Sequence, residues 1–110
     1  MEINEKCQDG LIILALKGRL DSNTSGEFEK KLLGMVEHGE NRFILDFKDL
    51  DYISSAGLRV LLKAVKELKR TDGRLCVCDI KDYIREIFSL SGFLTFLPTH
   101  ANLEEALKSF

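Results

Sequence analysis

The chain has 110 residues, of which 16 are basic and 18 acidic, giving a formal net charge of −2. This length suits one domain, and the slight acidic excess argues against nucleic acid as a partner. The longest apolar run, Leu11–Leu16, is too short to span a bilayer, and MEINEK lacks the features of a signal peptide, so we expect a cytoplasmic protein without membrane association.

Residues 2–7 and 11–17 are two extended segments separated by Gln8-Asp9-Gly10. Asp-Gly between apolar or alternating runs is a strong hairpin signal. The second segment is apolar at nearly every position, which is typical of a strand covered on both faces. The chain is therefore expected to open with two antiparallel strands.

A helix is predicted next, because helix-capping residues occupy positions 21–25 and an apolar stripe of helical spacing follows. Thr24 and Glu27 have the spacing of a capping box. His38-Gly39 is expected to end the helix.

Phe43–Phe47 has the composition of a short buried strand, and residues 48–53 that of a polar loop with Leu50 and Ile53 turned inward. A helix is expected from about Ala56 until residues 71–73. Its basic residues fall mostly opposite the apolar stripe and predict a solvated helix face: Arg59, Lys63, Lys66, Lys69 and Arg70.

The last third repeats the alternation. Residues 75–78 predict a strand and residues 82–91 a helix. An apolar piece, 93–97, lies between Gly92 and Pro98. The alternation of elements calls for a last strand in this region, and the path of residues 92–99 is left open. The final helix is centred on residues 103–107, with Asn102 or Thr99 as its cap. The resulting order is β-β-α-β-α-β-α-β-α, which predicts an α/β fold with a mixed, mostly parallel sheet of four to five strands and about four helices.

Three cysteines give no sign of a metal site. Cys76 and Cys78 are two residues apart, without the C-x-x-C spacing or a nearby histidine that zinc sites use. An odd count without a secretion signal fits a reducing compartment. All three, Cys7 included, are expected to be small apolar residues in or near the core. No metal or other cofactor is expected.

Function is expected at the carboxyl ends of the parallel strands. Two segments arrive there, residues 18–22 and 51–58. Asp21 in the first either caps the following helix or offers a carboxylate to a partner. The same edge would carry Ser54 and Ser55.

One of these two serines can cap the helix that follows, which leaves the other exposed. Ala56 and Gly57 are small, so they allow either close internal packing or the approach of another surface. A phosphate on Ser55 would suit a helix N-terminus. It would add about −1.5 to −2 charges and repel a packed partner. The residues themselves leave open whether this turn is only a cap or a switch.

Catalysis has little support in the sequence. The residues around Ser55 do not form G-x-S-x-G, and neither His38 nor His100 comes with an acid that would orient it. Neither G-x-G-x-x-G nor a P-loop occurs. We expect no enzymatic activity.

The pair G-x-L-D at Gly18–Asp21 and D-Y-I-S-S-A-G-L at Asp51–Leu58 is similar to the anti-sigma-factor antagonists of the STAS domain family. The resemblance covers residues 1–110. It implies a bacterial regulator without catalysis that binds an anti-sigma factor with serine kinase activity and so releases a sigma factor. The kinase phosphorylates one serine, which ends the interaction, and a metal-dependent serine phosphatase reverses this step.

Carried over by position, the phosphorylated residue is Ser55. Ser54 is the second choice, because a serine stands there where many members have Asp. Arg59 stands where a glycine is common, which points to a different partner. The alternative is a docking or scaffold subunit that is not phosphorylated. A monomer or weak dimer is expected, and the predicted partner-binding residues are Asp21, Ser22, Asn23, Ser54, Ser55, Ala56, Gly57 and Leu58.

Overall fold

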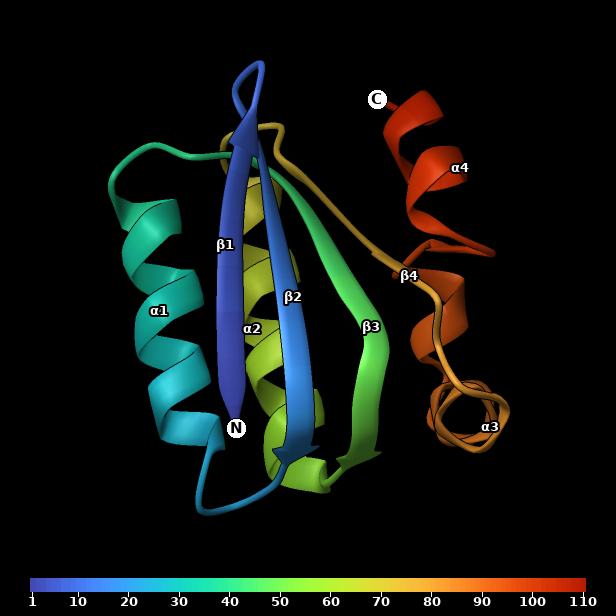
Figure 1. The fold of residues 1–110 in the computed structure, drawn as a ribbon. Helices are drawn as coiled ribbons and strands as arrows, with labels where there is room; N and C mark the ends of the chain where they lie inside the picture. Colours follow the sequence, from blue (N-terminus) through green and yellow to red (C-terminus); the bar gives the residue numbers. More distant parts are fainter.

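The computed structural model describes all 110 residues and contains one five-stranded sheet in the order β1-β2-β3-β4-β5. Figure 1 labels the first four of these strands. β1 runs antiparallel to β2, and the other neighbours pair in parallel. The predicted mixed, mostly parallel sheet is therefore confirmed. The strands are β1 (Glu2–Gln8), β2 (Leu11–Leu20), β3 (Arg42–Ile53), β4 (Arg74–Cys78) and β5 (Thr99–His100).

Four helices cover the sheet, three on one face and one on the other. Side chains of α1, α2 and α3 join the larger apolar core, whereas α4 packs with a smaller cluster on the opposite face. The helices are α1 (Ser25–Glu37), α2 (Ser55–Lys69), α3 (Asp82–Leu90) and α4 (Leu103–Lys108).

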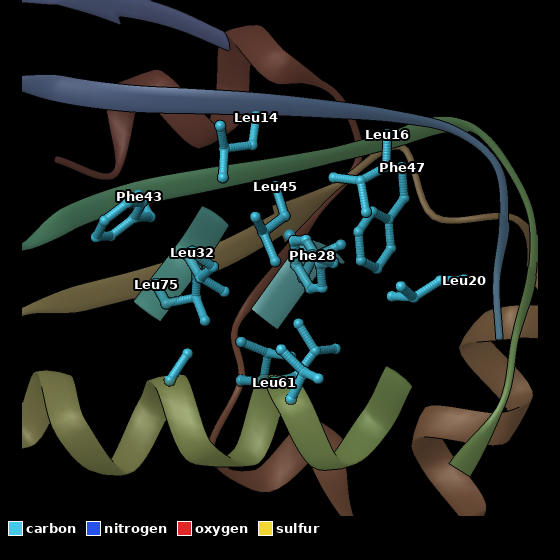
Figure 2. Close-up of a cluster of buried hydrophobic side chains, with 14 of the residues drawn as sticks. Leu14, Leu16, Leu20, Phe28, Leu32, Phe43, Leu45, Phe47, Leu61 and Leu75 are labelled. Atoms are coloured by element: carbon cyan, nitrogen blue, oxygen red, sulfur yellow. The ribbon is translucent and has the colours of Figure 1, made fainter. Parts of the chain in front are cut away.

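β2 is buried on both faces, as its continuous apolar run predicts. Ile12, Leu14 and Leu16 belong to the larger core, and Leu11 and Ile13 to the smaller one. Figure 2 shows strand side chains of the larger core directed towards Leu61 of α2. Alternate residues of a strand point to opposite faces, so both faces need apolar residues when helices cover both.

The hairpin prediction is confirmed as well. Asp9 has φ 53° and Gly10 has φ 79°, and β1 pairs with β2 from Gln8↔Leu11 onward. Positive φ at both central residues is what a type I′ turn requires.

β3 is longer than the sequence analysis predicted. Residues 48–53, expected to be a loop, continue the strand as far as Ile53. The register with β2 shifts between Ala15 and Lys17 and again between Gly18 and Arg19. These irregularities break the two-residue alternation of buried positions. Residues 48–53 therefore lack the sequence pattern by which a strand is predicted.

The path of residues 92–99, which the sequence left open, is settled by the structure, and the apolar piece 93–97 is not a strand. Phe93–Thr95 form a short 3₁₀ helix after Gly92, which has φ 80°. The ring of Phe93 packs between those of Phe88 and Phe96, at centroid distances of 5.7 and 5.0 Å. Packing of these rings therefore favours a helical turn in this segment. The last strand forms only at Thr99–His100.

Two other local expectations are corrected. Thr24 and Glu27 form no capping box, because the Thr24 hydroxyl donates to the Arg19 carbonyl at 2.8 Å. Cys7 is exposed, since it lies on the edge strand β1, whereas the other two cysteines are buried. The cap of α4 is Asn102, whose side-chain oxygen accepts from the Glu105 N–H at 2.9 Å.

Candidate functional site

The two segments singled out by the sequence meet at one edge of the sheet. β2 and β3 end side by side with Leu20 opposite Ile53, and α1 and α2 begin just beyond these ends (lower part of Figure 1). The backbone N–H of Ser54 donates to the Leu20 carbonyl at 2.9 Å. We call the surface formed by residues 21–23 and 54–58 the docking edge.

Asp21 organises the first segment through its own carboxylate. Its Oδ1 accepts from the backbone N–H of Asn23 at 2.9 Å and of Thr24 at 3.2 Å. The hydrogen bond from Asn23 is the largest influence on the pKa of this carboxyl. Together with the hydrogen bonds from Thr24 and the charge of Arg19 it outweighs desolvation and holds that pKa below its usual value. The side chain keeps 24% of its surface exposed, so an ionised carboxylate remains within reach of a partner.

Ser54 and Ser55 have different roles in the structure. Ser54 is the N-cap of α2, and its hydroxyl oxygen accepts from the Gly57 N–H at 3.4 Å. Ser55 is the first helical residue and is exposed. The expectation that one serine caps the helix and the other is left exposed is therefore confirmed, and the exposed serine is Ser55.

The remaining residues of the docking edge divide by exposure. Ser22 and Asn23 are exposed, Ala56 and Leu58 are half-buried, and Gly57 is buried. Gly57 packs against Leu20 and Ile53 of its own chain. It therefore shapes the edge by letting α2 lie close to the sheet rather than by offering a surface itself.

Several residues beside the docking edge were missed by the sequence analysis. The Arg19 guanidinium lies over the Tyr52 ring, 4.3 Å from its centroid. The Lys81 ammonium pairs with the Asp51 carboxylate at 2.5 Å. Arg19, Asp51 and Tyr52 lie within the two recognised motifs, but the sequence does not indicate that their side chains are exposed beside the docking edge. Nothing in the sequence connects Lys81 to this edge.

The buried thiols show no sign of a reactive site. Desolvation raises the pKa of Cys76 to about 11, and desolvation together with the charges of Asp46 and Asp79 raises that of Cys78 to about 12. Asp46, Cys78 and Asp79 bring one ligand atom each within 4.8 Å of one another. The group holds a single thiol and two carboxylates, with no histidine or second cysteine among its members, so it lacks the ligand set of the usual zinc sites.

Neither histidine is arranged to activate a serine. The His38 ring is hydrogen-bonded to the Gly34 carbonyl at 2.7 Å, at the end of α1 that lies away from the docking edge. His100 lies in β5 beside Cys78. The acid, base and nucleophile of a hydrolase are not brought together here.

No helix in the structure has both the length and the apolar content needed to traverse a bilayer.

Comparisons with known proteins agree on one family. A sequence model of the STAS domain matches residues 2–106. BtrV of Bordetella bronchiseptica, assigned as an anti-sigma factor antagonist, is 42% identical over 102 residues, which cover 93% of this chain and 88% of BtrV.

Solved structures show the same fold at lower identity. The crystal structure of Thermotoga maritima TM1081, also assigned as an anti-sigma factor antagonist, superposes with a TM-score of 0.93 at 19% identity, covering 97% of this chain and 92% of the other. The Bacillus cell fate determinant SpoIIAA in its phosphorylated form gives a TM-score of 0.79 at 22% identity, with 98% of each chain covered.

Proposed function

The chain belongs to the STAS domain family, and on this basis we propose that it is an anti-sigma factor antagonist controlled by phosphorylation of Ser55. In the unmodified state the docking edge binds an anti-sigma factor, which then releases its sigma factor. Phosphorylation of Ser55 breaks this complex. The single observation that supports the switch most directly is that Ser55 is exposed while its neighbour Ser54 is occupied as the N-cap.

The location of Ser55 explains how a phosphate could act without unfolding the protein. At the first position of α2 the phosphate would face free backbone N–H groups and the positive end of the helix dipole. About −1.5 to −2 charges would nevertheless appear on a surface that a partner must desolvate. Asp21 already contributes one carboxylate to the same edge. The phosphate would therefore add to a negative charge that is already present there, and acidic groups of the partner would be repelled.

The remaining assignments complete this proposal. The anti-sigma factor would itself be the serine kinase, and a serine phosphatase would restore the active form. The chain would contribute no catalysis of its own and would act in the cytoplasm as a single domain of residues 1–110, as a monomer or weak dimer. The name of BtrV and the existence of a phosphorylated SpoIIAA support this proposal.

The test is to incubate the purified protein with ATP and the kinase-type anti-sigma factor encoded beside it, and to map any peptide that gains about 80 Da, the mass of a phosphoryl group. We expect phosphate on Ser55 in the wild type and in Ser54→Ala, and none in Ser55→Ala. Phosphate on Ser54 would keep the mechanism and move the switch by one residue. A stable complex without phosphorylation would contradict the switch and favour a permanent docking subunit.

A further inference from the structure

We propose that the surface bound by the anti-sigma factor continues from the docking edge onto an aromatic ridge formed by Arg19, Tyr52 and Tyr83. The inference rests on the proposed function and deepens it, because it adds three partner-binding residues outside residues 21–23 and 54–58. On the partner we expect an apolar pocket that receives the Tyr52 ring and contains a hydrogen-bond acceptor for its hydroxyl.

Arg19 joins the ridge to the docking edge. Its guanidinium covers the Tyr52 ring at 4.3 Å and its Nε lies 3.6 Å from Asp21 Oδ2. Arg19 and Tyr52 are also paired positions on β2 and β3, directly before Leu20 and Ile53. The Arg19 side chain is 63% exposed and Tyr52 is 37% exposed, so both face solvent beside Asp21.

Tyr83 fixes the start of α3 against the same strand end. Its hydroxyl donates to the Asp51 carbonyl at 2.6 Å, and Lys81 pairs with the Asp51 carboxylate. The Tyr83 residue is nevertheless 51% exposed. The two tyrosines therefore project from neighbouring, mutually bonded segments, and each is held by a contact within the chain.

Tyrosine and arginine are over-represented among residues that dominate binding energy at protein interfaces. Side chains that are already held in place lose less entropy when they bind, and a tyrosine ring offers an apolar body with a polar tip. The Tyr52 hydroxyl donates no hydrogen bond within the chain, unlike that of Tyr83. It is therefore the group left free for a partner.

Leu90 provides a matched comparison on the same helix. It is the most exposed large apolar side chain, at 84%, and it lies at the opposite end of α3 from Tyr83, about 10 Å along the axis at 1.5 Å per residue. If exposed apolar area alone attracted the partner, Leu90 would matter as much as the tyrosines.

The experiment uses calorimetry to measure the dissociation constant of the complex between the purified protein and the kinase-type anti-sigma factor encoded beside it. We expect Tyr52→Ala to weaken binding by at least about tenfold, Tyr83→Ala by a smaller factor, and Leu90→Ala by less than about twofold. Tyr52→Thr is a second variant at the same position, and it keeps a residue that is suited to a strand. Circular dichroism of each variant checks that the protein is folded.

The outcomes separate this inference from the proposed function. If Tyr52→Thr and Tyr83→Ala bind as the wild type does while Ser55→Asp does not, the ridge is wrong and the switch remains. If the wild type does not bind the anti-sigma factor, the proposed function fails and the ridge fails with it. If Tyr52→Thr leaves partner affinity unchanged but abolishes a dimer seen in sedimentation velocity, the ridge belongs to a second copy of the chain and the inference is overturned.

Discussion

Gly57 lies so close to Leu20 that a Cβ atom on the glycine would come within 2.8 Å of the leucine Cγ and within 2.9 Å of Ile53 Cγ1. The contact joins the start of α2 to the ends of β2 and β3. The glycine in the Ser-Ser-Ala-Gly turn is therefore explained by packing within the chain, and it sets the distance of the helix, and with it Ser55, from the sheet.

Gly57→Ala should accordingly destabilise the protein by about 1–3 kcal/mol, the usual cost of overpacking a core. Gly34→Ala is the matched control, because it also replaces a helical glycine but meets nothing within 4 Å. That substitution should stabilise by up to about 1 kcal/mol through helix propensity. Urea denaturation of both variants measures the difference, and equal effects would refute the packing argument.

The division of roles between the two serines predicts that their alanine substitutions differ in their effect on stability. Ser54→Ala removes the N-cap hydrogen bond and should lower the free energy of unfolding by about 0.5–1 kcal/mol, towards the low end of the range because the bond is long at 3.4 Å. Ser55→Ala removes an exposed hydroxyl and should change stability by less than about 0.5 kcal/mol. A larger loss in Ser55→Ala than in Ser54→Ala would show that the cap is assigned to the wrong serine.

Charge at position 55 should control partner binding. Ser55→Ala keeps a neutral surface and should bind the anti-sigma factor as the wild type does while resisting phosphorylation. Ser55→Asp should keep its fold, because a carboxylate suits the helix N-terminus, but it should bind more weakly. Calorimetry with the unphosphorylated proteins compares them, and wild-type affinity in Ser55→Asp would speak against charge expulsion.

The hydrogen bonds to Asp21 predict a pH dependence. Because they hold the folded-state pKa of this carboxyl below its unfolded value, its ionisation adds stability that is complete above about pH 4 and is lost as the pH falls through the folded pKa. Asp21→Asn should therefore be less stable than the wild type near neutrality and approach it in acid. Urea denaturation from pH 7 to pH 3 tests this, and a constant difference would be inconsistent with it.

Thiol reactivity should distinguish the three cysteines. At pH 8 a thiol reagent should label Cys7 alone in the native protein, because Cys76 and Cys78 are buried and their raised pKa values keep them protonated. All three should react in denaturant. Cys7→Ser provides the control, since it should abolish native labelling, and residual labelling in that variant would indicate that the sheet opens.

Hydrophobic patterning was enough to predict much of the fold. The apolar run of β2, the Asp-Gly turn and the helical stripe of α2 are local features, and each of them indicated its element correctly. The docking edge could be anticipated too, because parallel strands bring their carboxyl ends together. The motifs at Gly18–Asp21 and Asp51–Leu58 had to meet once β2 and β3 were neighbours.

Other features depended on particular contacts that periodicity does not report, some of them local and some between distant segments. The length of β3 follows from register shifts against β2. The 3₁₀ helix at residues 93–95 follows from the packing of the Phe93 ring on Phe88. The Thr24 hydroxyl donates a hydrogen bond to the Arg19 carbonyl and does not cap its own helix. The Tyr83 hydroxyl donates to the carbonyl of Asp51, which is 32 positions earlier in the chain. Periodicity in a sequence reports only which residues are buried, whereas the partner that buries or bonds each one is fixed when the sheet and helices pack together.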